Sequence, residues 1–258
     1  MRNRVKRVTR SWRKHEALAL VVAGAILLLS MGCAARKLVV VSDLANPPFA
    51  TVDANGNPSG FEVELLDTIA RGLDLRLHIR RRPFEELLEV VVKGKADIAC
   101  ATIGMTPERA ERVRFSRPYF RTGIAVVVRA GDPAAGGEIT QLAGRRVAAA
   151  RGTTSERAVR LALPHAQGVY ERKADTPFAE MLRRGEVDAV VMDGPDAARL
   201  AAAEPATFKI MKARLVEENY ALALRLDAVE LASRIDEILS ELESSGRLEE
   251  MRRRHGVE

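Results

Sequence analysis

The chain has 258 residues, of which 47% are hydrophobic and 29% are charged. This length and composition allow one large or two modest α/β domains with proper hydrophobic cores. The formal charge of +6 would suit a nucleic-acid partner, but the excess lies in residues 1–33, which hold seven Lys or Arg residues and one Glu. The rest of the chain carries equal numbers of basic and acidic residues, so its charge does not predict nucleic-acid binding.

The first 35 residues have the pattern of a targeting segment. A basic stretch precedes the uncharged run 17–30, which is short for a transmembrane helix and suited to a signal peptide. Gly32-Cys33 resembles a lipoprotein processing site, so we expect Cys33 to carry a lipid anchor in the periplasm, at the outer face of a bacterial membrane. Ordinary cleavage after Ala35 and an uncleaved anchor are the alternatives. The other cysteine, Cys100, would then have no disulfide partner.

The following residues alternate between strand and helix patterns. Short β-branched or alternating runs predict strands, apolar residues at helical spacing predict helices, and Gly and Pro mark the ends of both. In chain order the predicted elements are a strand at 37–41, a loop at 44–50, a turn at 53–58, a helix from Gly60 to Gly72, a strand at 75–79 and a helix from Pro83 to Val92.

The most informative stretch runs from Ala96 to Phe115. Asp97–Thr102 is short, apolar and bounded by turn residues, which is typical of a buried strand. The pattern breaks at Gly104, and Thr106-Pro107-Glu108 then predicts a helix start, with Thr as the N-cap and Pro at the first helical position.

Arg109 stands in the first turn of that predicted helix. A cation there opposes the positive end of the helix dipole, which favours anions. The guanidinium therefore indicates a bound anion at the carboxyl end of a strand, where open α/β sheets place their ligands. An ion pair of Arg109 with Glu108 or another surface acid is the alternative interpretation.

A second α/β unit is predicted beyond a Gly-rich break at 131–137. Residues 126–130 read as a crossover into it, and 145–150 as its first strand. That strand leads into Gly152-Thr153-Thr154 at the start of a helix, an arrangement that binds anions through free backbone N–H groups. N-capping alone would also explain the two hydroxyl groups.

The strand at 187–191 delivers Asp193 at its carboxyl end, where the side chain is either a ligand contact or the N-cap of the helix after it. Residues 93–99 and 184–190 echo each other, each joining a helix to a buried strand, which favours two similar lobes. The apolar run Tyr220–Leu226 predicts a return crossover, and two helices follow at 231–242 and 248–254.

Several of these motifs together resemble the family 3 extracellular solute-binding proteins, the polar amino acid binders of ABC importers. The resemblance rests on the run from Gly94 to Tyr119, on Gly60-Phe61-x-Val63-x-Leu65-Leu66 after the Pro-Pro-Phe loop, and on Gly152-Thr153-Thr154. It spans 37–256. It implies an α/β fold of the two-lobed type II periplasmic-binding-protein class, each lobe a mostly parallel sheet flanked by helices. Residues 36–125 with 222–258 would form lobe one, and 126–221 lobe two.

The resemblance also implies a set of solute contacts. Arg109 matches the arginine that clamps the solute's α-carboxylate, Thr153 and Thr154 complete this grip from lobe two, and Asp193 matches the acid that binds the α-ammonium. The matching positions on lobe one are Asp43, Asn46, Phe49, Phe84, Thr102 and Gly104. Two of these depart from the pattern: Asn46 is not aromatic, and Gly104 replaces a Ser or Thr whose hydroxyl helps to hold the head group. Phe84 would serve equally as a core residue.

No nucleophile–base pair, metal-ligand spacing or phosphate loop stands out, so we expect a binding protein without a cofactor or metal. The resemblance implies a monomer that captures an amino acid or a related carboxylate by lobe closure and delivers it to an ABC-transporter permease. Dipeptide-like, opine-like and other anionic solutes are alternatives. A dehydratase of the cyclohexadienyl or arogenate type, with Asp43 or Asp193 as the acid, is a second interpretation. A sensor module acting in trans on a receptor is a third.

Overall fold

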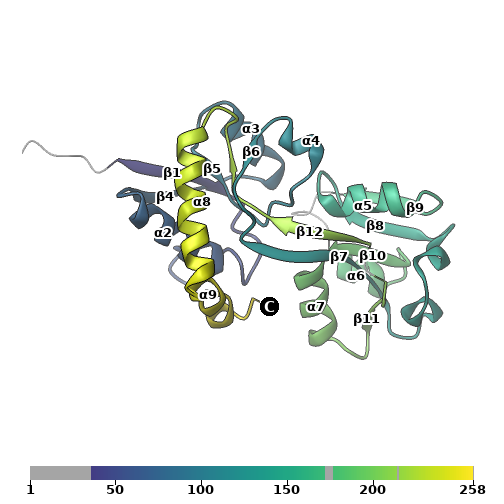
Figure 1. Ribbon diagram of the computed structural model, residues 1–258. Helices are drawn as coiled ribbons and strands as arrows, with labels where there is room; N and C mark the ends of the chain where they lie inside the picture. The colour runs from purple at the N-terminus through teal and green to yellow at the C-terminus, as the bar shows by residue number, and fades with distance from the viewer. Residues whose placement is uncertain (1–35, 172–176, 214, 258) are drawn as a thin grey trace, which may run out of the picture.

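The computed structural model describes residues 36–171, 177–213 and 215–257. The predicted leader with Cys33 lies outside these residues. The described chain forms two α/β lobes that lie side by side and are joined by strands running between them (Figure 1). Within these ranges no helix has the length and apolar character needed to cross a membrane.

Lobe one is built on a five-stranded sheet in the order β4-β1-β5-β13-β6. β1 pairs in parallel with β4 and β5, whereas β13 pairs antiparallel with β5 and β6. The sheet is therefore mixed, because the returning strand β13 runs against its neighbours. The strands are β1 (Lys37–Ser42), β4 (Arg76–Arg81), β5 (Ile98–Ala99), β6 (Arg114–Phe115) and β13 (Ala223–Leu224).

Helices cover both faces of this sheet. On one face, apolar residues at helical spacing in α2, α8 and α9 form the larger core, which includes Leu65, Ile235 and Met251. On the other face, Leu87 and Val91 of α3 pack against the sheet in a smaller core. The elements outside the sheet are the hairpin β2 (Thr51–Val52) and β3 (Pro58–Ser59), the helices α2 (Phe61–Gly72), α3 (Leu87–Val92), α4 (Pro107–Ala110), α8 (Val229–Ser244) and α9 (Arg247–His255), and the 3-10 helix η1 (Phe84–Glu86).

Lobe two contains a six-stranded sheet in the order β11-β7-β10-β8-β9, with β12 also paired to β7. β8 is parallel to β9 and β10, and the long strand β7 is antiparallel to β10, β11 and β12. The strands are β7 (Phe120–Arg129), β8 (Arg146–Ala150), β9 (Gln167–Glu171), β10 (Ala189–Asp193), β11 (Phe208–Ile210) and β12 (Val216–Tyr220).

Two apolar clusters hold lobe two together. Val159 of α5 packs on one face of the sheet, whereas Leu182 of α6 and Ala197 of α7 pack on the other. β10 is buried on both sides, which explains its continuous apolar sequence. The helices are α5 (Thr154–Ala162), α6 (Phe178–Arg183) and α7 (Gly194–Ala203), with the 3-10 turns η2 (Pro133–Gly136) and η3 (Ile139–Leu142).

Two adjacent segments carry the chain between the lobes. β7 and β12 pair antiparallel from Phe120 opposite Tyr220 to Ile124 opposite Val216. Just inside lobe one, the Tyr119 amide donates to the Tyr220 carbonyl at 2.9 Å. The return crossover was predicted as one strand over Tyr220–Leu226, but it is divided between β12 of the second sheet and β13 of the first.

The strand predicted at Asp97–Thr102 is shorter in the structure, where β5 contains only Ile98 and Ala99. Thr102 has a left-handed backbone with φ of 46°, which cannot continue a strand. Its amide donates to a side-chain carboxylate of Glu62 at 2.7 Å instead of a strand neighbour. β9, β11 and most of β12 were not predicted, because β9 and β12 are largely polar and β11 has only three residues.

The sequence echo between the lobes corresponds to a shared contact. Asp97 accepts the Val39 amide of β1 at 2.8 Å, and Asp188 accepts the Arg146 amide of β8 at 3.0 Å. Each aspartate thus ties the entry of a buried strand to the first strand of its own lobe. Asp188 also binds the Arg146 guanidinium, which lowers the pKa of its carboxyl group to about 2.

We expect Asp188→Ala to lower the free energy of unfolding by about 1–3 kcal/mol, because it leaves a partly buried amide and a guanidinium without their acceptor. Urea unfolding near neutral pH measures this loss. The matched control is Asp67→Ala, which removes an exposed ion pair with Arg71 and should cost less than about 0.5 kcal/mol. Equal effects of the two variants would contradict the structural role of Asp188.

Candidate functional site

Arg109 lies where the two lobes meet. Its helix α4 begins at Thr106, whose hydroxyl accepts the Arg109 amide at 3.2 Å, as the sequence predicts for an N-cap. The guanidinium donates through Nη1 to the carbonyl of Gly104 at 2.7 Å and through Nη2 to the carbonyl of Gly152 at 3.0 Å. Gly152 belongs to lobe two, so one side chain connects the two lobes where they meet.

Arg109 is surrounded by carboxylates. Glu108, the suggested partner, forms an ion pair with Arg157 of α5 at 3.1 Å. Burial lowers the pKa of the Arg109 guanidinium, and the negative charges of Glu218, Asp193 and Glu108 oppose this shift. The charge is thus held in a largely enclosed place among carboxylates. The guanidinium also lies 5.7 Å from the ring centroid of Phe84, within cation–π range.

The start of α5 presents the second predicted element of the site. Gly152 has φ of +75°, and Thr153 is the N-cap of the helix. The Thr153 hydroxyl donates to the carbonyl of Ala150 at 2.6 Å and accepts the Glu156 amide at 3.4 Å, so capping describes its present contacts. The Thr154 hydroxyl instead points across the cleft and donates to the carboxylate of Glu218.

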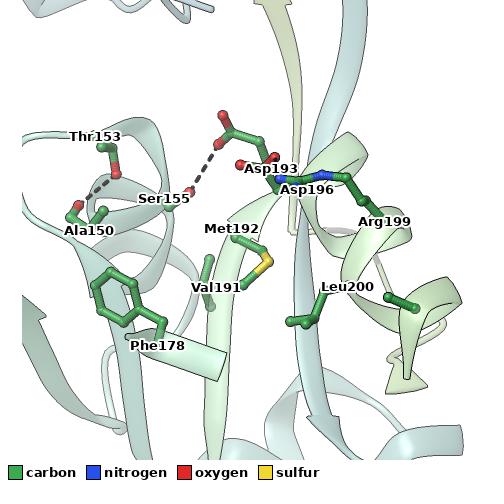
Figure 2. Close-up of a pocket in the computed structure, with 11 residues that line it drawn as sticks. Ala150, Thr153, Ser155, Phe178, Val191, Met192, Asp193, Asp196, Arg199 and Leu200 are labelled. Carbon is green, nitrogen blue, oxygen red and sulfur yellow. Dashed lines mark hydrogen bonds and ion pairs between the residues drawn. The ribbon is translucent and has the colours of Figure 1, made fainter. Parts of the chain in front are cut away.

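Asp193 occupies the carboxyl end of β10. It stands at the N-cap position of α7, yet its side chain makes no capping hydrogen bond. Its carboxylate accepts the hydroxyl of Ser155 at 3.3 Å (Figure 2). Burial, followed by the negative charges of Asp193 and Glu218, raises the pKa of Tyr220 well above its ordinary value. Tyr220 is itself fully buried, and both carboxylates lie near enough for their charges to act on its phenol.

A pocket of about 300 Å³ opens beside Asp193 in lobe two. Figure 2 shows the polar side chains of Thr153, Ser155 and Asp193 along one side and the apolar side chains of Phe178 and Leu200 along the other. It lies among the ends of β8 and β10 and the helices α5, α6 and α7. The sequence did not predict this pocket, because its lining comes from five separate elements.

The wall on lobe one is polar and buried. The Asn46 side-chain amide donates to the Thr102 hydroxyl at 2.9 Å, and both residues are less than a tenth exposed. Asp43 is also buried, and its carboxylate accepts the Ala45 amide at 3.3 Å. The structure thus brings together three of the predicted lobe-one residues, on the loop after β1 and the turn after β5.

The two predicted phenylalanines lie in different environments. Phe49 is 1% exposed and packs edge-on against Phe61, Phe120 and Tyr220, with ring centroids 5.1–6.1 Å apart. Its described contacts are those of a core residue. Phe84 is partly exposed and lies beside the Arg109 guanidinium, while it also packs against the smaller core of lobe one.

Sequence reasoning missed Glu218, which lies beside Gly104. A Cβ atom built on Gly104 would lie 2.1 Å from the Glu218 Oε1 atom and 2.7 Å from the Thr154 Cγ2 atom. Any side chain at position 104 therefore requires these two residues to move. No local sequence signal marked Glu218, because β12 reads Val-Glu-Glu-Asn-Tyr and is too polar to predict a strand.

Sequence reasoning also missed the burial of Glu62. It is an acid in the first turn of α2, yet it is 1% exposed and accepts the Thr102 amide and the Tyr119 hydroxyl. Its Oε2 atom has no hydrogen-bond partner among the described residues. Burial raises the pKa of this carboxyl group to about 7, while the two hydrogen bonds act in the opposite direction. Glu62 thus supports Thr102 from beneath the cleft.

The fold and the cleft define a two-lobed α/β protein with a charged site between its lobes. Residues 38–258 match the bacterial extracellular solute-binding proteins, family 3, and the chain belongs to this family. The predicted family and the two-lobed fold are thereby confirmed.

Two relatives are similar in sequence over most of the chain. It is 31% identical to the amino-acid-binding protein AabA of Dichelobacter nodosus over 241 residues, which cover 90% of this chain and 92% of that protein. It is 22% identical to the ABC transporter arginine-binding protein 1 of Escherichia coli strain K12, over 88% of this chain and 94% of that protein. These relatives are named as binding proteins, not as enzymes.

Among solved structures, the P235GK mutant of ArgBP from T. maritima superimposes with a TM-score of 0.77 at 33% identity, over 86% of this chain and 96% of that one. The ancestral amino acid-binding protein AncCDT-1, described as a precursor of cyclohexadienyl dehydratase, has a TM-score of 0.75 at 26% identity, over 85% of this chain and 94% of that one.

We expect the stability of the protein to fall as the pH rises, through the titration of Glu62. Its folded pKa lies above its ordinary value of 4.5, so the folded state binds the proton more tightly. This contribution is fully present below about pH 4.5 and is lost as the pH rises through about 7. In urea unfolding, wild type should lose roughly 2–3 kcal/mol relative to Glu62→Gln between pH 5 and pH 8.

The control for this experiment is Glu86→Gln, which alters an exposed carboxylate on η1. Its unfolding free energy should follow that of wild type across the same pH range. A constant difference between Glu62→Gln and wild type would show that Glu62 does not titrate in this window.

Proposed function

We propose that this chain captures an amino acid in the cleft between its lobes and delivers it to the permease of an ABC importer, outside the cytoplasmic membrane. The observation that carries the proposal is the position of Arg109, which belongs to lobe one and donates to Gly152 of lobe two. A cation that already connects both walls is suited to a carboxylate held by both lobes together.

The amino acid head group fits the charges of the cleft. Its carboxylate would bind the guanidinium of Arg109 and the N-terminal end of α5, where helix N–H groups and the dipole favour an anion. Its ammonium group would donate hydrogen bonds to the carboxylate of Asp193. Thr102, Asn46 and Asp43 would complete the polar wall on lobe one.

The same arrangement supports capture by closure. Arg109 and α5 approach one another only when the lobes are together, so a carboxylate between them interacts more strongly with the closed form. A ligand shifts such an equilibrium by its difference in affinity for the two forms. The ion pair between Glu108 and Arg157 spans the same gap near the rim of the cleft.

The relatives support the amino acid class without selecting one member. Their names refer to cystine, histidine, arginine and glutamine. These solutes share the α-carboxylate and α-ammonium groups and differ in the side chain. A site built around Arg109 and Asp193 recognises what they share, and the pocket beside Asp193 is available to the part that differs.

The first experiment is a thermal-shift screen of the purified protein, without its leader, against the amino acids, cystine, citrulline and small carboxylates. A solute that binds only the folded state stabilises it, by about 2.7 kcal/mol at a concentration one hundred times its Kd. Such a solute should therefore raise the melting temperature. We expect at least one amino acid to do so. A response confined to carboxylates without an amine would contradict the proposal.

We expect Arg109→Ala to weaken binding of that amino acid at least about tenfold, because truncating one member of a desolvated charge pair costs roughly 2–5 kcal/mol. Isothermal titration calorimetry measures the change. The control is Arg112→Ala, which removes an exposed ion pair with Glu89 just after the same helix and should leave the affinity unchanged. Unchanged affinity in Arg109→Ala would exclude it as the carboxylate clamp.

The similarity to AncCDT-1 makes the dehydratase interpretation worth one direct assay. Asp43 and Asp193 would have to supply the acid, and both are engaged with neighbouring polar groups. Incubation with prephenate or arogenate, followed by absorbance of the aromatic product, decides the question. We expect no turnover.

The proposal also includes a lipid anchor at Cys33 and a monomeric state. In detergent phase partitioning of membranes from cells that express the full chain, wild type should enter the detergent phase and Cys33→Ala should not. Recovery of both forms in the aqueous phase would favour cleavage after Ala35.

A further inference from the structure

Glu218 lies on the crossover strand β12 and is not among the site residues predicted for either lobe. Glu218 is 5% exposed and Tyr220 is fully buried. Their neighbours on the strand, Glu217 and Asn219, are exposed. The backbone bridge between Gly104 and Tyr220 fixes β12 against the turn after β5. The Glu218 carboxylate is thereby placed where a side chain at position 104 would otherwise lie.

This carboxylate contacts groups from both sides of the cleft. It accepts the Thr154 hydroxyl of lobe two, and its Oε1 atom lies against Gly104 of lobe one. Its charge acts on the Arg109 guanidinium and on the Tyr220 phenol, and the charge of Asp193 acts on the same two groups. Glu218 and Asp193 therefore both lie near enough for their charges to act on the Arg109 guanidinium.

We propose that Glu218 is a solute-contacting residue that holds the α-ammonium group jointly with Asp193 and makes the site select solutes with an amine beside the carboxylate. The inference deepens the proposed function and depends on it. It names the chemical feature that the site requires and narrows the solute class to α-amino acids and close relatives that retain this amine.

Electrostatics gives the reason for this selectivity. A solute with only a carboxylate gains the attraction of Arg109 but also brings a like charge towards Glu218 and Asp193, in a space that is partly shielded from water. An ammonium group attached to the same carbon offsets this repulsion and supplies hydrogens to both acids. The Glu218 Oε1 atom lies where a side chain at position 104 would begin, which places Glu218 at the predicted head group instead of the solute's side chain.

The test combines a change in the protein with a change in the solute. Each amino acid that binds in the screen is compared with its des-amino analogue, for example L-arginine with δ-guanidinovalerate and L-glutamine with glutaramate. Calorimetry is performed on wild type, Glu218→Gln and the control Glu217→Gln, which alters an exposed neighbour on the same strand.

We expect Glu218→Gln to lower the affinity for the amino acid at least about tenfold. The affinity for the des-amino analogue should change less than about twofold or increase. Glu217→Gln should match wild type for both solutes. A residue that merely supports the fold would lower the affinity for both solutes by the same factor. An equal loss of affinity for both solutes would therefore overturn the inference, and so would unchanged affinity for both. If wild type binds no amino acid, the proposed function itself fails.

Two further variants keep the test decisive if Glu218→Gln folds poorly. Glu218→Asp retains the charge on a shorter side chain and should keep the preference for the amine. Gly104→Ser should lose affinity, because a side chain there meets the Glu218 carboxylate and the Thr154 methyl group. The double variant Gly104→Ser with Glu218→Ala should bind the amino acid more tightly than Gly104→Ser alone. Its preference for the amino acid over the des-amino analogue should remain smaller than that of wild type. Full preference in that double variant would exclude Glu218 as the source of selectivity.

Discussion

Two hydrogen bonds of the Arg109 guanidinium determine the geometry of the cleft, one to Gly104 within its own lobe and one to Gly152 in the facing lobe. Both acceptors are backbone carbonyl groups, so the arginine orients two turns of chain as well as carrying a charge. The surrounding acids, Glu218 and Asp193, keep that charge in place despite its burial. Much of the polar chemistry of the site is arranged around this one cation.

Support for this arrangement comes from beneath the cleft. Glu62 binds the amide of Thr102 and the hydroxyl of Tyr119, and the Tyr119 amide in turn binds the carbonyl of Tyr220. A single buried carboxyl group thus connects the polar wall of lobe one with the point where both crossover strands leave that lobe. The left-handed backbone of Thr102 is held by this contact, because its amide lies outside the strand ladder.

The parts of the molecule that follow local rules could be predicted from the sequence. Thr106-Pro107, Thr153 and the apolar run before Asp193 each carry a strong local signal, and each lies where that signal placed it. Glu218 and Glu62 could not be placed in the same way. Their roles depend on partners far away in the chain, Gly104 in one case and Tyr119 in the other, and a glutamate carries no local sign of burial.

The aromatic cluster under the cleft determines where the molecule can bend. The rings of Phe120 and Tyr220, at the lobe-one ends of β7 and β12, stack on each other with centroids 5.7 Å apart and are enclosed by the core around Phe49. These ends cannot rotate without opening that core. For the proposed lobe closure we therefore expect the hinge just beyond them, near the exposed residues Arg121 and Asn219, so that most of both strands would move with lobe two.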